Sequence, residues 1–100
     1  MDRLSRLLHL RDDVRHRRVE DEGVLVLQNE AEVMVLNDLA YRIIELAVEQ
    51  RTVASIIAAL EEEYDVARDV LTGDVMAYID ELTNIGVARL TDATSEENGA

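Results

Sequence analysis

Residues 24–47 read VLVLQNEAEVMVLNDLAYRIIELA, and they decide the fold because their hydrophobic period changes at Asn37. Before Asn37, two short apolar runs flank Asn29 and Glu30, a pattern that predicts two antiparallel strands joined by a turn. After Asn37 the apolar side chains recur at helical spacing, at Leu39, Ile43, Leu46 and Ala47. The stretch therefore predicts a β-hairpin followed by a helix, with Asn37 or Asp38 as the N-cap.

The predicted hairpin is apolar on both of its faces. Two sets of side chains alternate along its strands. Leu25, Leu27, Met34 and Leu36 form one set, and Val24, Val26, Val33 and Val35 form the other. A sheet with one solvated face normally alternates apolar with polar residues. We therefore expect the second face to be covered, and a docked peptide or a second copy of the chain would supply that cover.

Outward from this stretch, residues 14–19 alternate weakly and predict a further strand, and residues 87–90 predict a short last one. Thr52 is expected to cap a second helix with the inward side chains Val53, Ile56, Ile57 and Leu60. Asp65 or Asp69 is expected to open a third helix that Gly86 ends, with the inward side chains Val75, Tyr78, Ile79, Leu82 and Ile85. This order predicts an α+β domain similar to a winged helix-turn-helix: a small antiparallel sheet of about three strands followed by three helices.

We expect the chain to divide into a basic N-terminal arm (1–13), a folded domain (14–90) and a disordered acidic tail (91–100). The arm is expected to form a short amphipathic turn or helix, because three leucines lie at helical spacing, Leu4, Leu7 and Leu8. Residues 1–18 carry a net charge of +3 and the remaining residues carry −15. Two interpretations stay open: the arm lies on the chain's own acidic surface, or it binds a partner.

Composition excludes several classes of protein. The chain has no cysteine, so disulfides, zinc–thiolate sites and a cysteine nucleophile are absent. Its longest uncharged run, residues 52–60, is far shorter than the roughly 20 residues of a membrane helix, and no secretory signal is visible. The net charge of −12 opposes binding to nucleic-acid backbones. We therefore expect a soluble, cytoplasmic domain with no membrane or nucleic-acid partner.

No group of residues predicts catalysis. The two histidines, His9 and His16, lie among arginines that repel a cation, so we expect them to be surface side chains and not metal ligands. The acidic run at residues 61–63 points in several directions on a helix and is typical of a solvated helix end. Neither a catalytic triad nor a glycine-rich phosphate loop is present. We expect no enzyme activity, no cofactor and no metal.

Three blocks of sequence resemble the PqqD family. The first is Val35-Leu36-Asn37 with Ala40, Ile43 and Leu46; the second is Arg51-Thr52-Val53 with Ile56, Leu60 and Tyr64; the third is Asp74-Val75 with Tyr78, Ile79, Leu82 and Gly86. They occur in the family's order and spacing, and the resemblance spans residues 14–90.

Two positions depart from the family pattern. Gln50 stands where a glycine usually precedes the second block, and the hairpin at residues 26–30 lacks the family's proline and paired glycine. Whether the pathway is pyrroloquinoline quinone biosynthesis or another one is therefore left open. The resemblance implies the broader class of domains that recognise the leaders of ribosomally synthesised, post-translationally modified peptides.

In that class, the resemblance implies that the leader adds as a strand to the third strand of the sheet and packs on the third helix. The domain then acts as a non-catalytic chaperone that presents the precursor to a modifying enzyme, such as a radical-SAM or maturation enzyme. The candidate peptide-binding residues are those of the strand edge and of one helix face: Glu32, Val33, Met34, Val35, Leu36, Asp74, Ala77, Tyr78 and Glu81.

The residues favour such a site independently, because an exposed sheet edge is a template for strand addition. Tyr78 has two interpretations, as a groove residue or as part of the core. We also expect that the chain can form a homodimer.

Two other functions compete with leader binding. A winged-helix regulator would use the third helix for DNA or protein contacts, but that helix is acidic. An accessory or dimerisation module would have no peptide ligand.

Overall fold

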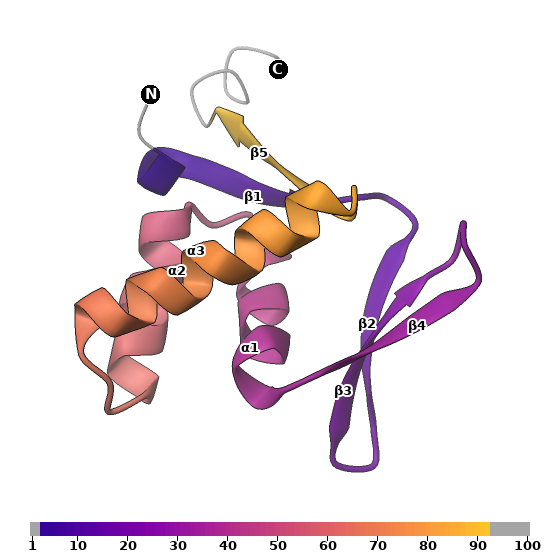
Figure 1. The fold of residues 1–100 in the computed structure, drawn as a ribbon, viewed down its shortest axis with the longest axis horizontal. Coiled ribbons are helices and arrows are strands. Elements are labelled where there is room, and N and C mark those ends of the chain that lie inside the picture. The colour runs from indigo at the N-terminus through magenta and orange to yellow at the C-terminus, as the bar shows by residue number, and fades with distance from the viewer. Residues whose placement is uncertain (1–2, 93–100) are drawn as a thin grey trace.

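A computed structural model describes residues 3–92 of the chain and shows an α+β fold (Figure 1). Two small sheets pack on three α-helices. In chain order the elements are the 3₁₀ helix η1 (Arg3–Ser5), β1 (Arg6–Leu10), β2 (Val14–Val19), β3 (Glu22–Leu27), β4 (Glu32–Leu36), α1 (Asp38–Ala47), α2 (Val53–Glu63), α3 (Arg68–Asn84) and β5 (Ala88–Asp92). The small antiparallel sheet followed by three helices is confirmed.

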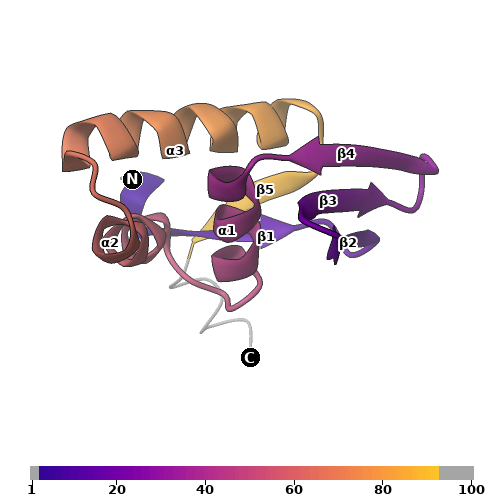
Figure 2. The same cartoon turned by 90° about the horizontal axis from the view of Figure 1, so that it is seen from below.

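The larger sheet has the strand order β2-β3-β4, with every neighbouring pair antiparallel. Its inner face packs on α1, where Leu25 is fully buried and Tyr41 lies against Gly23. The buried residues of all three helices join this face in one hydrophobic core. In Figure 2, β4 is the strand of this sheet that lies nearest to α3.

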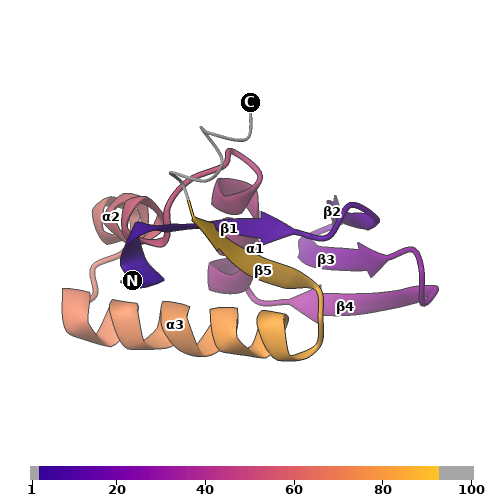
Figure 3. The ribbon, with the colours of Figure 1, turned by 90° about the horizontal axis from the view of Figure 1, so that it is seen from above.

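The second sheet pairs β1 with β5 and runs along one side of the helices (Figures 1 and 3). We expected a turn or helix around Leu7 and Leu8, and this prediction was wrong. The chain forms only a short 3₁₀ turn at Arg3–Ser5, and both leucines lie in the strand β1. Pairing with residues 88–92 satisfies the backbone hydrogen bonds of residues 6–10 and buries both leucines, which an isolated amphipathic turn could not do.

The first two helices begin where the sequence predicts. The side chain of Asn37 accepts a hydrogen bond from the Ala40 amide at 2.7 Å, and Thr52 accepts one from Ser55 at 3.1 Å. The start of α3 differs from the prediction, because its N-cap is Ala67 and no side chain caps it.

The inward residues of α3 also differ from the prediction at the end of the helix. Val75, Ile79 and Leu82 are buried as predicted, but Ile85 is 48% exposed. Ile85 is the C-cap, where the backbone leaves helical geometry and the side chain leaves the apolar stripe.

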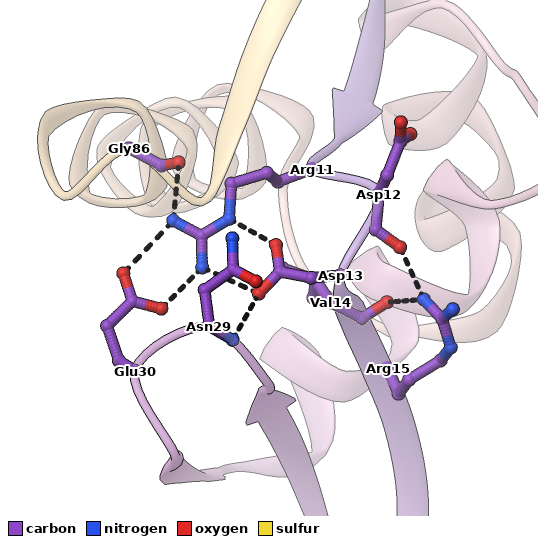
Figure 4. Close-up of polar contacts among 8 residues, drawn as sticks. All are labelled: Arg11, Asp12, Asp13, Val14, Arg15, Asn29, Glu30 and Gly86. Atoms are coloured by element: carbon purple, nitrogen blue, oxygen red, sulfur yellow. Dashed lines mark hydrogen bonds and ion pairs between the residues drawn. The ribbon is translucent and has the colours of Figure 1, made fainter.

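The contacts of the basic N-terminal segment favour the first of its two interpretations. Arg3 forms an ion pair with Asp80 of α3 at 2.6 Å. Arg11 is bonded to Asp13 and to Glu30, with a distance of 2.5 Å to the latter (Figure 4). These arginines therefore lie on acidic side chains of their own chain. Of the predicted tail, Thr91 and Asp92 belong to β5, and residues 93–100 lie outside the described residues.

Candidate functional site

A groove of about 410 Å³ opens between β4, the start of α1 and the middle of α3. Seven of the nine sequence-predicted site residues line it: Met34, Val35, Leu36, Asp74, Ala77, Tyr78 and Glu81. Glu32 and Val33 lie on the same strand but outside the groove. The structure thus brings the two predicted halves of the site together although about 40 residues separate them in sequence.

Strand β4 forms one wall of the groove and is also an edge of its sheet, since its only strand neighbour among the described residues is β3. The direction of its free backbone groups follows from the β2–β3 hairpin. That hairpin turns through only two residues, Glu20 and Asp21, so its closing pair, Val19 and Glu22, must be a hydrogen-bonded pair.

Hydrogen bonding alternates from this pair along the central strand. Strand β3 therefore bonds to β2 through Val24 and Val26, and to β4 through Gly23, Leu25 and Leu27. The residues of β4 that bond to these three are Leu36, Met34 and Glu32, in that order. The N–H and C=O groups of Val33 and Val35 consequently point out of the sheet, toward the free edge.

The side chains of β4 separate by the same alternation. Val33 and Val35 lie on the outer face and are 62% and 66% exposed, whereas Leu36 is buried on the inner face. Met34 is half-buried and packs against the core from the groove side. The two valines are the uncovered part of the second apolar face, because Val24 on the neighbouring strand is buried.

Tyr78 forms the wall of the groove on α3, and both of its interpretations hold in part. The residue is half-buried, packs against the core and lines the groove. Its hydroxyl is enclosed and has no hydrogen-bond partner among residues 3–92. Burial, and secondarily the nearby carboxylate of Glu81, raises the pKa of Tyr78 to about 12.

The charged residues of the groove are both acidic. Asp74 and Glu81 are exposed, and neither forms an ion pair with a described residue. No arginine lines the groove. The site therefore combines an apolar floor, a free strand edge and an uncompensated negative rim.

The start of α1 supplies groove residues that the candidate list lacked: Asn37, Leu39, Ala40 and Ile43. Three of the four, Asn37, Ala40 and Ile43, belong to the first block of the family resemblance. Their sequence signal was present, but a cap and core residues of a helix give the same pattern.

Within residues 3–92, no three histidine or acidic side chains are arranged to hold a metal ion, and no described helix is long and apolar enough to cross a membrane. A second hollow of about 490 Å³ lies beside Arg11 and Asp13, but these side chains bind each other there (Figure 4).

The fold and the groove define a small winged-helix-like domain whose sheet edge faces a helix across an open cleft. The family model for coenzyme PQQ synthesis protein D (PqqD) matches residues 22–88, and the chain belongs to this family. No curated protein matches the chain in sequence.

Two solved structures share the fold. TbiB1 in complex with the TbiA(beta) leader peptide is 25% identical, with a TM-score of 0.74 over 81% of this chain and 94% of that chain. Lasso peptide synthetase B1 complexed with the leader peptide is 26% identical, with a TM-score of 0.73 over 82% of this chain and 96% of that chain.

Proposed function

We propose that the chain binds the leader of a precursor peptide in the groove between β4 and α3, as a non-catalytic chaperone. The observation that carries this proposal is the free edge of β4, which directs the backbone of Val33 and Val35 toward the space beside α3. Family membership and two similar structures that hold leader peptides support it.

Strand addition explains how such a groove would bind a peptide without chemistry. The outward groups of Val33 and Val35 offer backbone donors and acceptors, and the peptide side chains that face Met34 and Leu36 would enter the groove. The leader would also cover the apolar edge that the sheet leaves open. In this role the domain holds the leader while a modifying enzyme acts on the rest of the precursor, in the cytoplasm where that precursor is made.

The test is isothermal titration with the leader of the precursor peptide encoded next to the gene of this chain. We expect a dissociation constant in the micromolar range or below, about −8 kcal/mol or stronger. Val35→Pro removes an outward amide, so it should weaken binding roughly tenfold and leave the fold intact. Val33→Pro should act in the same direction.

Met34→Pro is the matched control, because the amide of Met34 points into the sheet. This variant should lower the melting temperature, whereas the two valine variants should not. Unchanged affinity in folded Val33→Pro and Val35→Pro proteins would exclude this edge as the docking site.

A further inference from the structure

The second property of the groove is its charge, which bears on the class of peptide that fits. Arginines neutralise only some of the acidic side chains elsewhere on the surface: Arg3 pairs with Asp80, Arg42 with Glu45 and Glu63, Arg51 with Glu49, and Arg68 with Glu61. Asp74 and Glu81 are exposed on the groove side of α3 without such a partner among residues 3–92. Their negative charge is therefore left for a ligand to compensate.

The spacing of these carboxylates matches an extended chain. Asp74 and Glu81 are separated by seven residues, which is about 10 Å along a helix, and Ala77 and Tyr78 lie midway between them. The axes of β4 and α3 are roughly parallel, with the two elements running in opposite directions (Figures 1 and 2), so a strand added to β4 would lie along the helix. In such a strand, side chains on one face repeat every two residues, about 7 Å apart.

We infer that the groove selects leaders that carry an apolar residue with a lysine or arginine two positions away on the same face. This inference rests on the proposed function and names the peptide class for the same site. The apolar side chain contacts Ala77 and Tyr78, and the basic side chain reaches the carboxylate of Asp74 or Glu81. A peptide with acidic residues at those positions is repelled by both ends of the groove.

The ring of Tyr78 supplies the apolar part of this recognition, because its hydroxyl is enclosed. This hydroxyl has no hydrogen-bond partner within the described part of the chain, and the neighbouring carboxylate of Glu81 keeps its surroundings negative. A basic side chain placed there gives the exposed carboxylate of Glu81 a partner. The occupant that the groove fits is therefore cationic and apolar in alternation, not acidic and not purely apolar.

The experiment is a display selection with random peptides long enough to span β4, followed by affinity measurements on the enriched sequences. The wild-type chain is compared with Asp74→Asn/Glu81→Gln and with the control Glu62→Gln/Asp65→Asn. The control removes the same two charges from exposed positions outside the groove. Each enriched peptide is also made with glutamate in place of its lysine or arginine.

We expect peptides selected on the wild type and on the control to be enriched in lysine or arginine two positions from an apolar residue. Their affinity should fall roughly three- to twentyfold at low salt in the Asp74→Asn/Glu81→Gln variant, and should be unchanged in the control. The glutamate-substituted peptides should bind the wild type more weakly by at least as much.

Groove-binding peptides, identified by their sensitivity to Val35→Pro, that show no basic enrichment overturn this inference and leave the proposed function standing. The same holds if the enrichment persists in the Asp74→Asn/Glu81→Gln variant. If no peptide is enriched, or if the enriched peptides are insensitive to Val35→Pro, both the inference and the proposed function fail.

Discussion

At the residue scale, Gln50 adopts a conformation that a side chain disfavours. Its φ is 60°, and its amide donates to the carbonyl of Ala47 at 2.9 Å, which ends the last turn after α1. A glycine usually precedes this block in the PqqD family, and the left-handed backbone gives the physical reason for that preference. Gln50, which departs from the family pattern, therefore occupies a strained position of the backbone.

Gln50→Gly should stabilise the domain, because glycine adopts this conformation without a steric penalty. We expect the free energy of unfolding to rise by about 0.5–1 kcal/mol and the melting temperature by roughly 2–8 °C. Gln50→Ala is the control, since alanine keeps the Cβ, and it should change stability by less than about 0.5 kcal/mol. Thermal unfolding followed by circular dichroism measures both variants. A Gly variant no more stable than the Ala variant would contradict this explanation.

Two glycines should respond in opposite ways to alanine. A Cβ on Gly23 would lie 2.3 Å from Cδ1 of Tyr41, whose ring is buried beneath the sheet, whereas a Cβ on Gly73 would meet nothing within 4 Å. Gly23→Ala should therefore lower the free energy of unfolding by about 1–3 kcal/mol. Gly73→Ala should raise it by about 0.5–1 kcal/mol, because alanine favours the helix. Denaturant unfolding measures both proteins, and a Gly23→Ala protein as stable as the wild type would show that this position is not packed against Tyr41.

At the element scale, one polar network holds the β3–β4 hairpin against the β1–β2 corner (Figure 4). Arg11 bridges Asp13 and Glu30, and the amide of Asn29 donates to Asp13 at 2.8 Å. Asn29 and Glu30 form the turn that leads into β4, so the network helps to position the strand that carries the proposed binding edge.

This network should make stability depend on acid through Asp13. The hydrogen bonds from Arg11, and then the one from Asn29, lower the pKa of Asp13 from 3.8 to about 2. A group with a depressed pKa contributes stability above its ordinary pKa and loses it as the pH falls through the lowered value. We therefore expect Asp13→Asn to be less stable than the wild type at neutral pH, and the difference to shrink from about pH 4 to pH 2.

Urea unfolding across this pH range measures the effect. Asp12→Asn is the control, because Figure 4 shows the Asp12 carboxylate directed away from Arg11. A pH dependence that is identical in Asp13→Asn and the wild type would exclude Asp13 as the source.

The wall of the groove on α3 gives a prediction that separates binding from folding. Tyr78→Phe keeps the ring but removes a hydroxyl that is enclosed without a partner in the described residues. The melting temperature should therefore stay equal or rise, and affinity for a leader should change by less than about threefold, because the enclosed hydroxyl is not accessible to a peptide. Isothermal titration together with thermal unfolding tests this. A fall in affinity of tenfold or more would contradict this prediction and show that the hydroxyl bonds to the peptide.

The accuracy of the sequence-based predictions also differs by element. The hairpin, the first two helices and their caps at Asn37 and Thr52 follow from local sequence patterns, and these predictions were correct. Strand β1 was missed because its pairing partner, β5, lies about 80 residues away, and local leucine spacing alone favours a helix. The α1 contribution to the groove was missed because capping and core residues carry no sign that they also face a cleft.

At the scale of the whole molecule, charge separates the functions that a winged-helix shape allows. The net charge is −12, and Arg68, the basic residue of α3, is paired with Glu61. Asp74 and Glu81 of the same helix face the groove without a counterion in the described chain. A helix with this charge would be repelled from a phosphate backbone and attracted to a cationic peptide. A winged-helix shape by itself is compatible with either ligand, but the electrostatics favour a peptide.

The same free edge predicts self-association when no leader is bound. Two chains can pair their β4 edges antiparallel about a two-fold axis, because Val33 and Val35 offer unpaired backbone groups and exposed apolar side chains. We expect a weak, concentration-dependent dimer that strengthens with added salt, since each chain carries a charge of −12 and salt screens the repulsion.

Analytical ultracentrifugation over a range of protein and salt concentrations measures this dimer. Because the leader and the second copy would compete for one edge, saturating leader should dissociate the dimer, and Val35→Pro should remove it while the chain stays folded. Arg68→Gln, which leaves β4 unchanged, serves as the control and should dimerise as the wild type does. A chain that stays monomeric at high concentration and high salt contradicts the prediction. A dimer that persists with leader bound would place the contact on another surface, with the outer edge of β2 as the next strand to test.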